Sequence, residues 1–132
     1  MHGGATHFPI ALLMVSVVFD HAGFWWRDEL RRREFHAFGF YSLLIAGAAS
    51  PVAVISGIAL SKGILLGTGM LALHHYFIWP AFGLLIGLAV WRLVMREHAS
   101  RRARACYLAL ASLALAAMMS AGYWGGEMLI GK

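Results

Sequence analysis

The sequence is poor in cysteine and in charge, and each shortage excludes a class of protein. Cys106 is the single cysteine, so the chain forms no internal disulfide and lacks the Cys-x-x-Cys-His motif that attaches haem covalently. Charged residues make up 13% of the 132 residues and hydrophobic residues 61%. This composition is too apolar for a soluble domain of this length. No nucleophile-and-base pattern and no phosphate-binding loop is recognisable. The composition predicts an integral membrane protein that is not an enzyme on its own.

Four apolar stretches are long enough to cross a hydrocarbon core of about 30 Å. They cover residues 6–26, 36–61, 70–94 and 105–124, and a charged loop is expected between the first two, over 27–34. Pro51 is expected to kink the second span. Gly83 and Gly87 form a G-x-x-x-G pair in the third span, which favours close contact between helices. We therefore predict one all-α domain over residues 1–132, an integral membrane four-helix bundle.

Arginine is concentrated in two of the three connections between these spans. The first connection holds Arg27, Arg31, Arg32 and Arg33. Five more lie in or beside the third connection: Arg92, Arg96, Arg101, Arg102 and Arg104. Only Lys62 and Lys132 lie on the opposite side. Because cytoplasmic loops carry the excess of basic residues, we predict both termini outside and both arginine loops in the cytoplasm. This orientation, with contact to anionic lipid, explains the net charge of +5 better than a nucleic-acid partner does.

Histidines mark both ends of the first span. His7 begins it, and His21 follows Asp20 near its close. At about 100° per residue, His21 returns to within roughly 40° of His7, about 21 Å further along the helix. Titratable groups inside hydrocarbon are costly, so they are read as functional by default and need partners.

In the predicted orientation, His7, His74, His75 and Glu127 lie in the outer half of the membrane. Two imidazoles from facing helices can bind the iron of haem b from opposite sides without a covalent anchor. His74 and His75 point about 100° apart, so only one of them can bind the same iron as His7. We prefer His75 because it lies closer around the helix to Gly83, on the expected packed face. Glu127 is expected to support the site by bonding an imidazole. The alternative is a set of interfacial histidines without a ligand.

The inner half offers a weaker second site. His21 and His36 flank the first loop at similar depth and could hold a second haem, although histidines at the water boundary are more often solvated. His98 is not expected to bind haem. Asp20 lies about one turn inside the membrane edge, where we expect it to pair with arginines of the loops rather than to relay protons.

Several short motifs together resemble one bacterial family. They are His7-Phe8-Pro9-Ile10 at the start of the first span, Asp20 at its inner end, a histidine early in the third span, and Gly125-Gly126-Glu127-Met128 after the fourth. The chain is similar over essentially its whole length to the family known as domain of unknown function 2231. The resemblance implies a four-span protein of the bacterial inner membrane. Relatives are sometimes fused to, or encoded beside, redox modules such as Rieske or cytochrome domains, which implies electron transfer by analogy.

We therefore expect an electron-transfer subunit that binds non-covalent haem b through His7 and His75 near the periplasmic side. Expected partners are the lipid bilayer and other membrane redox subunits of a respiratory or photosynthetic complex, or a periplasmic cytochrome or Rieske protein. The main alternative is a cofactor-free structural or assembly subunit of a larger membrane complex. A third class is a proton or metal-ion conductor built on Asp20, Glu127 and the histidines.

Overall fold

The computed structural model describes residues 2–95 and 99–130, and the side chains of residues 6–95 and 99–128. His98 lies outside these residues. The described chain forms four helices: α1 (His2–Trp25), α2 (Glu29–Leu60), α3 (Gly69–Met95) and α4 (Arg101–Ile130). Each is long and apolar enough to cross a membrane. The predicted all-α membrane fold with four spans is therefore confirmed.

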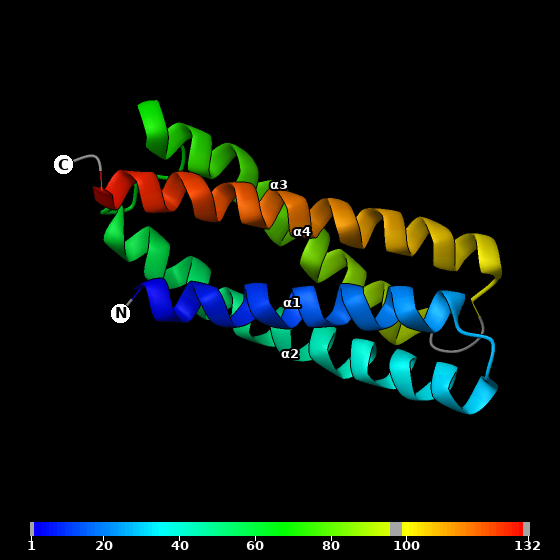
Figure 1. Ribbon diagram of the computed structural model, residues 1–132. Helices are drawn as coiled ribbons and strands as arrows, with labels where there is room; N and C mark the ends of the chain where they lie inside the picture. The colour runs from blue at the N-terminus through cyan, green and yellow to red at the C-terminus, as the bar shows by residue number, and fades with distance from the viewer. Residues whose placement is uncertain (1, 96–98, 131–132) are drawn as a thin grey trace.

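The helices run up and down in a bundle (Figure 1). The start of α1, the end of α4 and the α2–α3 connection lie at one end, which we call the histidine end because His74 and His75 lie in the first turns of α3. The α1–α2 connection, the end of α3 and the start of α4 lie at the other end, which we call the arginine end. The arrangement agrees with the predicted grouping of the two termini on one side. Which side faces the cytoplasm stays a prediction.

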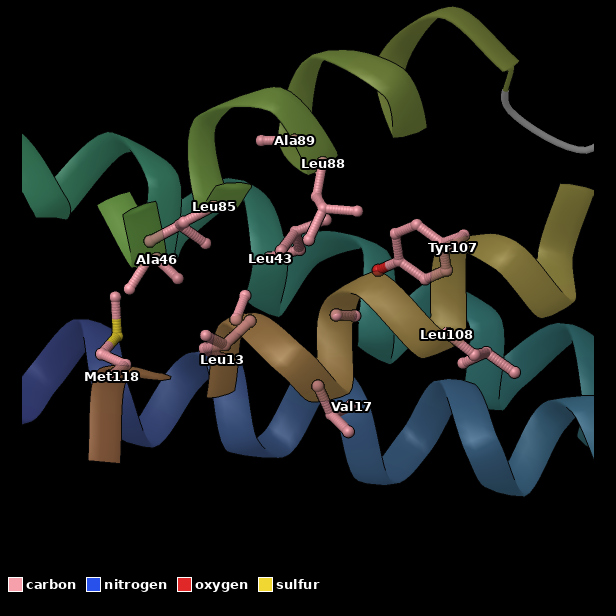
Figure 2. Close-up of a cluster of buried hydrophobic side chains, with 13 residues drawn as sticks. Leu13, Val17, Leu43, Ala46, Leu85, Leu88, Ala89, Tyr107, Leu108 and Met118 are labelled. Atoms are coloured by element: carbon pink, nitrogen blue, oxygen red, sulfur yellow. The ribbon is translucent and has the colours of Figure 1, made fainter. Parts of the chain in front are cut away.

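The core consists mainly of leucine and alanine side chains, with Val17, Tyr107 and Met118, and all four helices contribute to it. α1 packs mainly against α2 and α3 against α4, and smaller contacts of α1 with α4 and of α2 with α3 join these two hairpins. Leu13, Leu43 and Leu85 are fully buried where the hairpins meet (Figure 2). Such interdigitation stabilises a bundle in lipid, where water no longer drives helices together.

Helix boundaries differ from the predicted spans at both arginine-rich connections and at the end of the chain. α2 begins at Glu29, inside the predicted charged loop, because Asp28 caps it by accepting a hydrogen bond from the backbone N–H of Arg31 at 2.9 Å. An exposed salt bridge between Arg33 Nη2 and Glu29 Oε1, at 2.7 Å, further stabilises the first turn of α2. The predicted fourth span ends at residue 124, before Gly125 and Gly126, whereas α4 continues through both glycines to Ile130.

The prediction of close helix contact at Gly83 and Gly87 is wrong within this chain. Both residues are exposed, and a Cβ added at either would meet no atom within 4 Å. The close approach lies on α2 instead, where a Cβ on Gly47 would stand 3.3 Å from the Cβ of Ala89. α2 continues as a helix past Pro51, which lies inside it.

Candidate functional site

A buried carboxylate lies between the four helices, towards the arginine end. Asp20 of α1 is 1% exposed, and its Oδ2 accepts hydrogen bonds from Arg92 Nη1 and from the Tyr107 hydroxyl, the latter at 2.9 Å. The Ser16 hydroxyl lies 3.4 Å from Oδ2, and His36 Nδ1 lies 3.3 Å from Oδ1. We call these five residues the Asp20 cluster.

Each helix contributes to the Asp20 cluster. Ser16 and Asp20 come from α1, His36 from α2, Arg92 from α3 and Tyr107 from α4. Arg92 also donates from Nη2 to the backbone carbonyl of His36 at 2.9 Å, and its guanidinium carbon lies 5.0 Å from the centre of the Tyr107 ring. A charge in an apolar interior is tolerated when it is paired and fully hydrogen-bonded. Among the described side chains, every buried nitrogen and oxygen has a partner.

The cluster depends on a close approach of α1 and α2 at Gly39. A Cβ at this position would stand 2.5 Å from Asp20 Oδ1, a separation that real atoms do not adopt. The Ser16 hydroxyl donates to the backbone carbonyl of Gly39 at 2.8 Å, which holds the two helices together at this level. Gly39 therefore provides the space that the buried carboxylate occupies.

Beside the Asp20 cluster lies a cavity of about 790 Å³, which we call the arginine-end cavity. Among the residues that the structure describes, its charged lining consists of four arginines and two carboxylates: Arg32, Arg33, Arg92, Arg104, Asp20 and Glu29. His36 connects the cavity to the cluster, since its Nε2 lies 3.2 Å from Arg104 Nη1. The described part of the lining thus holds more arginines than carboxylates, next to a buried ion pair.

The two histidines predicted for a second haem have separate partners. His21 Nε2 lies 3.0 Å from the Ser112 hydroxyl of α4. Both ring nitrogens of His36 face charged groups, Asp20 on one side and Arg104 on the other. These contacts do not support ligation of one iron by this pair, which stays a prediction.

At the histidine end, two neighbouring imidazoles are each fixed by a backbone carbonyl. His75 is 8% exposed, and its Nδ1 lies 2.9 Å from the carbonyl oxygen of Leu66 in the α2–α3 connection. His74 Nδ1 lies 2.8 Å from the carbonyl oxygen of Ala121 on α4. Because a carbonyl only accepts, Nδ1 carries the hydrogen in both rings. Nε2 is then the nitrogen of each neutral ring that can bind a metal.

The remaining predicted residues of this site lie in other surroundings. His7 is exposed on α1, and Glu127 is half-buried on α4. Since His75 is buried beneath the α2–α3 connection, it and His7 occupy different environments, and their pairing across one iron stays a prediction. Within the described part of the chain, no three histidine, cysteine or carboxylate side chains are grouped to hold a metal ion.

The predicted pairing of Asp20 with an arginine is confirmed, and its partner is Arg92. The sequence analysis counted Arg92 with the second arginine-rich loop, whereas it belongs to the last turn of α3. It missed Tyr107 and Gly39 entirely. Ser16 could have been found, because it precedes Asp20 by four residues and therefore shares its helix face.

The fold and the buried polar cluster define a multi-pass helical membrane protein. Within that class, the chain belongs to the family described as predicted membrane protein, DUF2231, whose model matches residues 1–131. No curated protein and no solved structure matches this chain.

Proposed function

We propose that this protein is a membrane electron-transfer subunit that binds haem b at the histidine end, with His75 as one axial ligand. The observation that carries the proposal is the tether between His75 Nδ1 and the Leu66 carbonyl at 2.9 Å. Metal-binding histidines are typically fixed in this way through the other ring nitrogen, which sets the tautomer and directs Nε2 to the metal. Haem held between two imidazoles supplies a one-electron couple and needs no substrate pocket.

The surroundings of His75 hold the tether in place. Trp79, one turn further along α3, donates from Nε1 to the Leu65 carbonyl at 2.9 Å, so two successive carbonyls of the α2–α3 connection are bound to α3. The rings of His75 and Trp79 lie 6.0 Å apart. His74 is tied to α4, where a Cβ on Gly125 would stand 3.3 Å from its Nδ1. His74 remains the alternative ligand.

His7 is the proposed second ligand, since it lies near the start of α1 at the same end of the bundle, and Glu127 is the proposed supporting group. We propose that the protein lies in the bacterial inner membrane with the arginine end in the cytoplasm. Its proposed partners are membrane redox subunits or a periplasmic cytochrome or Rieske protein.

The second candidate is a cofactor-free structural or assembly subunit. The observation in its favour is the packed centre of the bundle, where Leu13, Leu43 and Leu85 are each 0% exposed. A structural subunit requires only the packed bundle and exposed faces for neighbouring membrane proteins.

A reduced-minus-oxidised spectrum of the purified protein, with a pyridine haemochrome assay, separates the two candidates. Haem binding predicts a b-type band and a stoichiometric haem content. The His75→Ala and His7→Ala variants should each lose the band, whereas His98→Ala, at a histidine that is not expected to bind haem, should keep it as the control. Loss in His74→Ala with retention in His75→Ala would assign the ligand to His74. A wild-type protein without haem would reject the proposal in favour of the structural subunit.

A further inference from the structure

We propose that His36 is a proton-sensitive link between α2 and α4, and that protonation of its ring releases Arg104 and loosens the first turns of α4. This inference goes beyond electron transfer and does not depend on haem binding, because it concerns the opposite end of the bundle. It rests on the two side-chain contacts of the His36 ring and on the position of this ring at the arginine-end cavity.

The two ring nitrogens of His36 face groups of opposite hydrogen-bonding character. Nδ1 lies 3.3 Å from Asp20 Oδ1, and Nε2 lies 3.2 Å from Arg104 Nη1. The carboxylate of Asp20, which is paired with Arg92, only accepts hydrogen bonds, whereas a guanidinium only donates them. Nδ1 must therefore carry the hydrogen, and Nε2 must present its lone pair. Both contacts form together only in the neutral Nδ1–H form of the ring.

Protonation of His36 breaks one of these contacts and keeps the other. The hydrogen added at Nε2 points at a donor of Arg104, so a hydrogen bond becomes a contact between two cations. Nδ1 still donates to Asp20, and the ring still lies against Gly23 of α1, where an added Cβ would stand 3.0 Å from Cε1. Because α1 holds the ring in place, the group that moves is the Arg104 side chain in the first turns of α4.

Water at the arginine end can reach His36, whose side chain is 22% exposed and lines the arginine-end cavity. Among the residues that the structure describes, the titratable and charged side chains that line this cavity, or the smaller pocket beside it, come from all four helices: Asp20 of α1, Glu29, Arg32 and Arg33 of α2, Arg92 of α3, and Arg101, Arg104 and Tyr107 of α4. Glu29 is paired with Arg33, and Asp20 with Arg92. In the predicted orientation the link responds to acidification on the cytoplasmic side.

His36 differs in this respect from other histidines of the protein. His21 Nε2 lies 3.0 Å from the Ser112 hydroxyl, which can donate or accept, so protonation of His21 preserves that contact. His74 and His75 donate from Nδ1 to backbone carbonyls, and a hydrogen added at Nε2 leaves these bonds intact. At His36, by contrast, an obligatory donor faces the nitrogen that gains the hydrogen.

Amide hydrogen exchange of the full chain in nanodiscs, followed over residues 105–110, tests the proposal. It is measured at about pH 8 and about pH 5, which bracket the usual titration of histidine. After correction for the intrinsic pH dependence of exchange, the wild-type protein should exchange about ten-fold faster in acid, because the hydrogen bond to Arg104 is lost. His36→Gln should remove this acceleration, since its amide can donate to Asp20 and accept from Arg104 at both pH values.

Two variants are the controls. His21→Gln removes a histidine at the same end of the bundle, and Glu97→Gln/His98→Gln removes two titratable groups that lie outside the described residues. Both should retain the acceleration in acid. Loss of the acceleration in either control, its persistence in His36→Gln or its absence from the wild-type protein would overturn the proposal.

Nitrogen-15 spectra of the histidine rings in the wild-type protein provide a second test that does not depend on the folding of any variant. At about pH 8 the His36 ring should be neutral and carry its hydrogen on Nδ1. A neutral ring with the hydrogen on Nε2, or a ring that is already doubly protonated at this pH, would overturn the proposal.

Discussion

Gly39 of α2 lies so close to the Asp20 carboxylate of α1 that a Cβ at position 39 would stand 2.5 Å from Oδ1. Gly39→Ala should therefore force the helices apart or displace the carboxylate from Arg92. We expect the free energy of unfolding to fall by about 1–3 kcal/mol, as in other overpacked interiors. Thermal or denaturant unfolding in detergent measures the loss.

The matched control for this change is Gly87→Ala, since a Cβ at that exposed position would meet no atom within 4 Å. Its stability should be unchanged or slightly raised, because alanine favours helix over glycine. Equal stability of the two variants would contradict the close approach of α1 and α2 at Gly39.

Removal of the charge on Asp20 should be one of the most destabilising single changes in this protein. Asp20→Asn leaves the buried guanidinium of Arg92 without its counter-ion, which costs about 3–5 kcal/mol in buried pairs. The double variant Asp20→Asn/Arg92→Gln removes both charges and should be more stable than Asp20→Asn alone. A double-mutant cycle of unfolding free energies checks this, and strictly additive losses would argue against a coupled pair.

Tyr107 should stabilise the bundle through its hydroxyl as well as its ring. The hydroxyl donates to Asp20 Oδ2 at 2.9 Å, and a hydrogen bond to a charged group contributes about 1.5–3 kcal/mol. Tyr107→Phe should lose about this amount in an unfolding experiment. Tyr123→Phe, at a side chain that is 61% exposed, should change stability by less than about 0.5 kcal/mol. The same small effect at both positions would show that the Tyr107 hydroxyl contributes little.

Trp79→Phe should loosen the α2–α3 connection. The variant keeps the aromatic ring but removes the Nε1 donor to the Leu65 carbonyl. Loss of about 1 kcal/mol in local stability corresponds to a roughly five-fold faster amide exchange over residues 61–68. Hydrogen exchange by mass spectrometry measures this rate, with Trp25→Phe at the arginine end as the control. Unchanged exchange in Trp79→Phe would mean that the connection is held by other contacts, such as His75 with Leu66.

The sequence predicts the helices better than the contacts between them. Long apolar runs locate the four spans because any chain that crosses hydrocarbon must satisfy its own backbone, and the helix is the local solution. The pairing of Asp20 with an arginine also follows from the sequence, since a carboxylate at that depth requires a counter-charge. Its identity as Arg92 does not follow, because the charge count assigned this residue to a loop.

Close approach between helices depends on which helix faces which, and local patterns do not give that information. The G-x-x-x-G spacing of Gly83 and Gly87 suggested a contact that this chain does not form, whereas Gly39 carries no such spacing and makes the tightest contact with Asp20. The preference for His75 over His74 rested on the same glycine pair. His75 is buried, as expected of a residue on the packed face of its helix, but the glycines from which that face was inferred are exposed. Which face of each helix points into the bundle cannot be read from the sequence, and both the glycine contact and the choice of histidine depend on it.

The ion pair of the Asp20 cluster joins the two hairpins of the bundle, since its acid is on α1 and its base on α3. During synthesis the first hairpin enters the bilayer before Arg92 exists, so the carboxylate then has only the partners on α1 and α2, Ser16 and His36. The second hairpin supplies the guanidinium that neutralises the carboxylate. Membrane insertion and tertiary assembly are thereby coupled, and a truncated chain that lacks α3 would expose an uncompensated acid to the quality-control machinery of the cell.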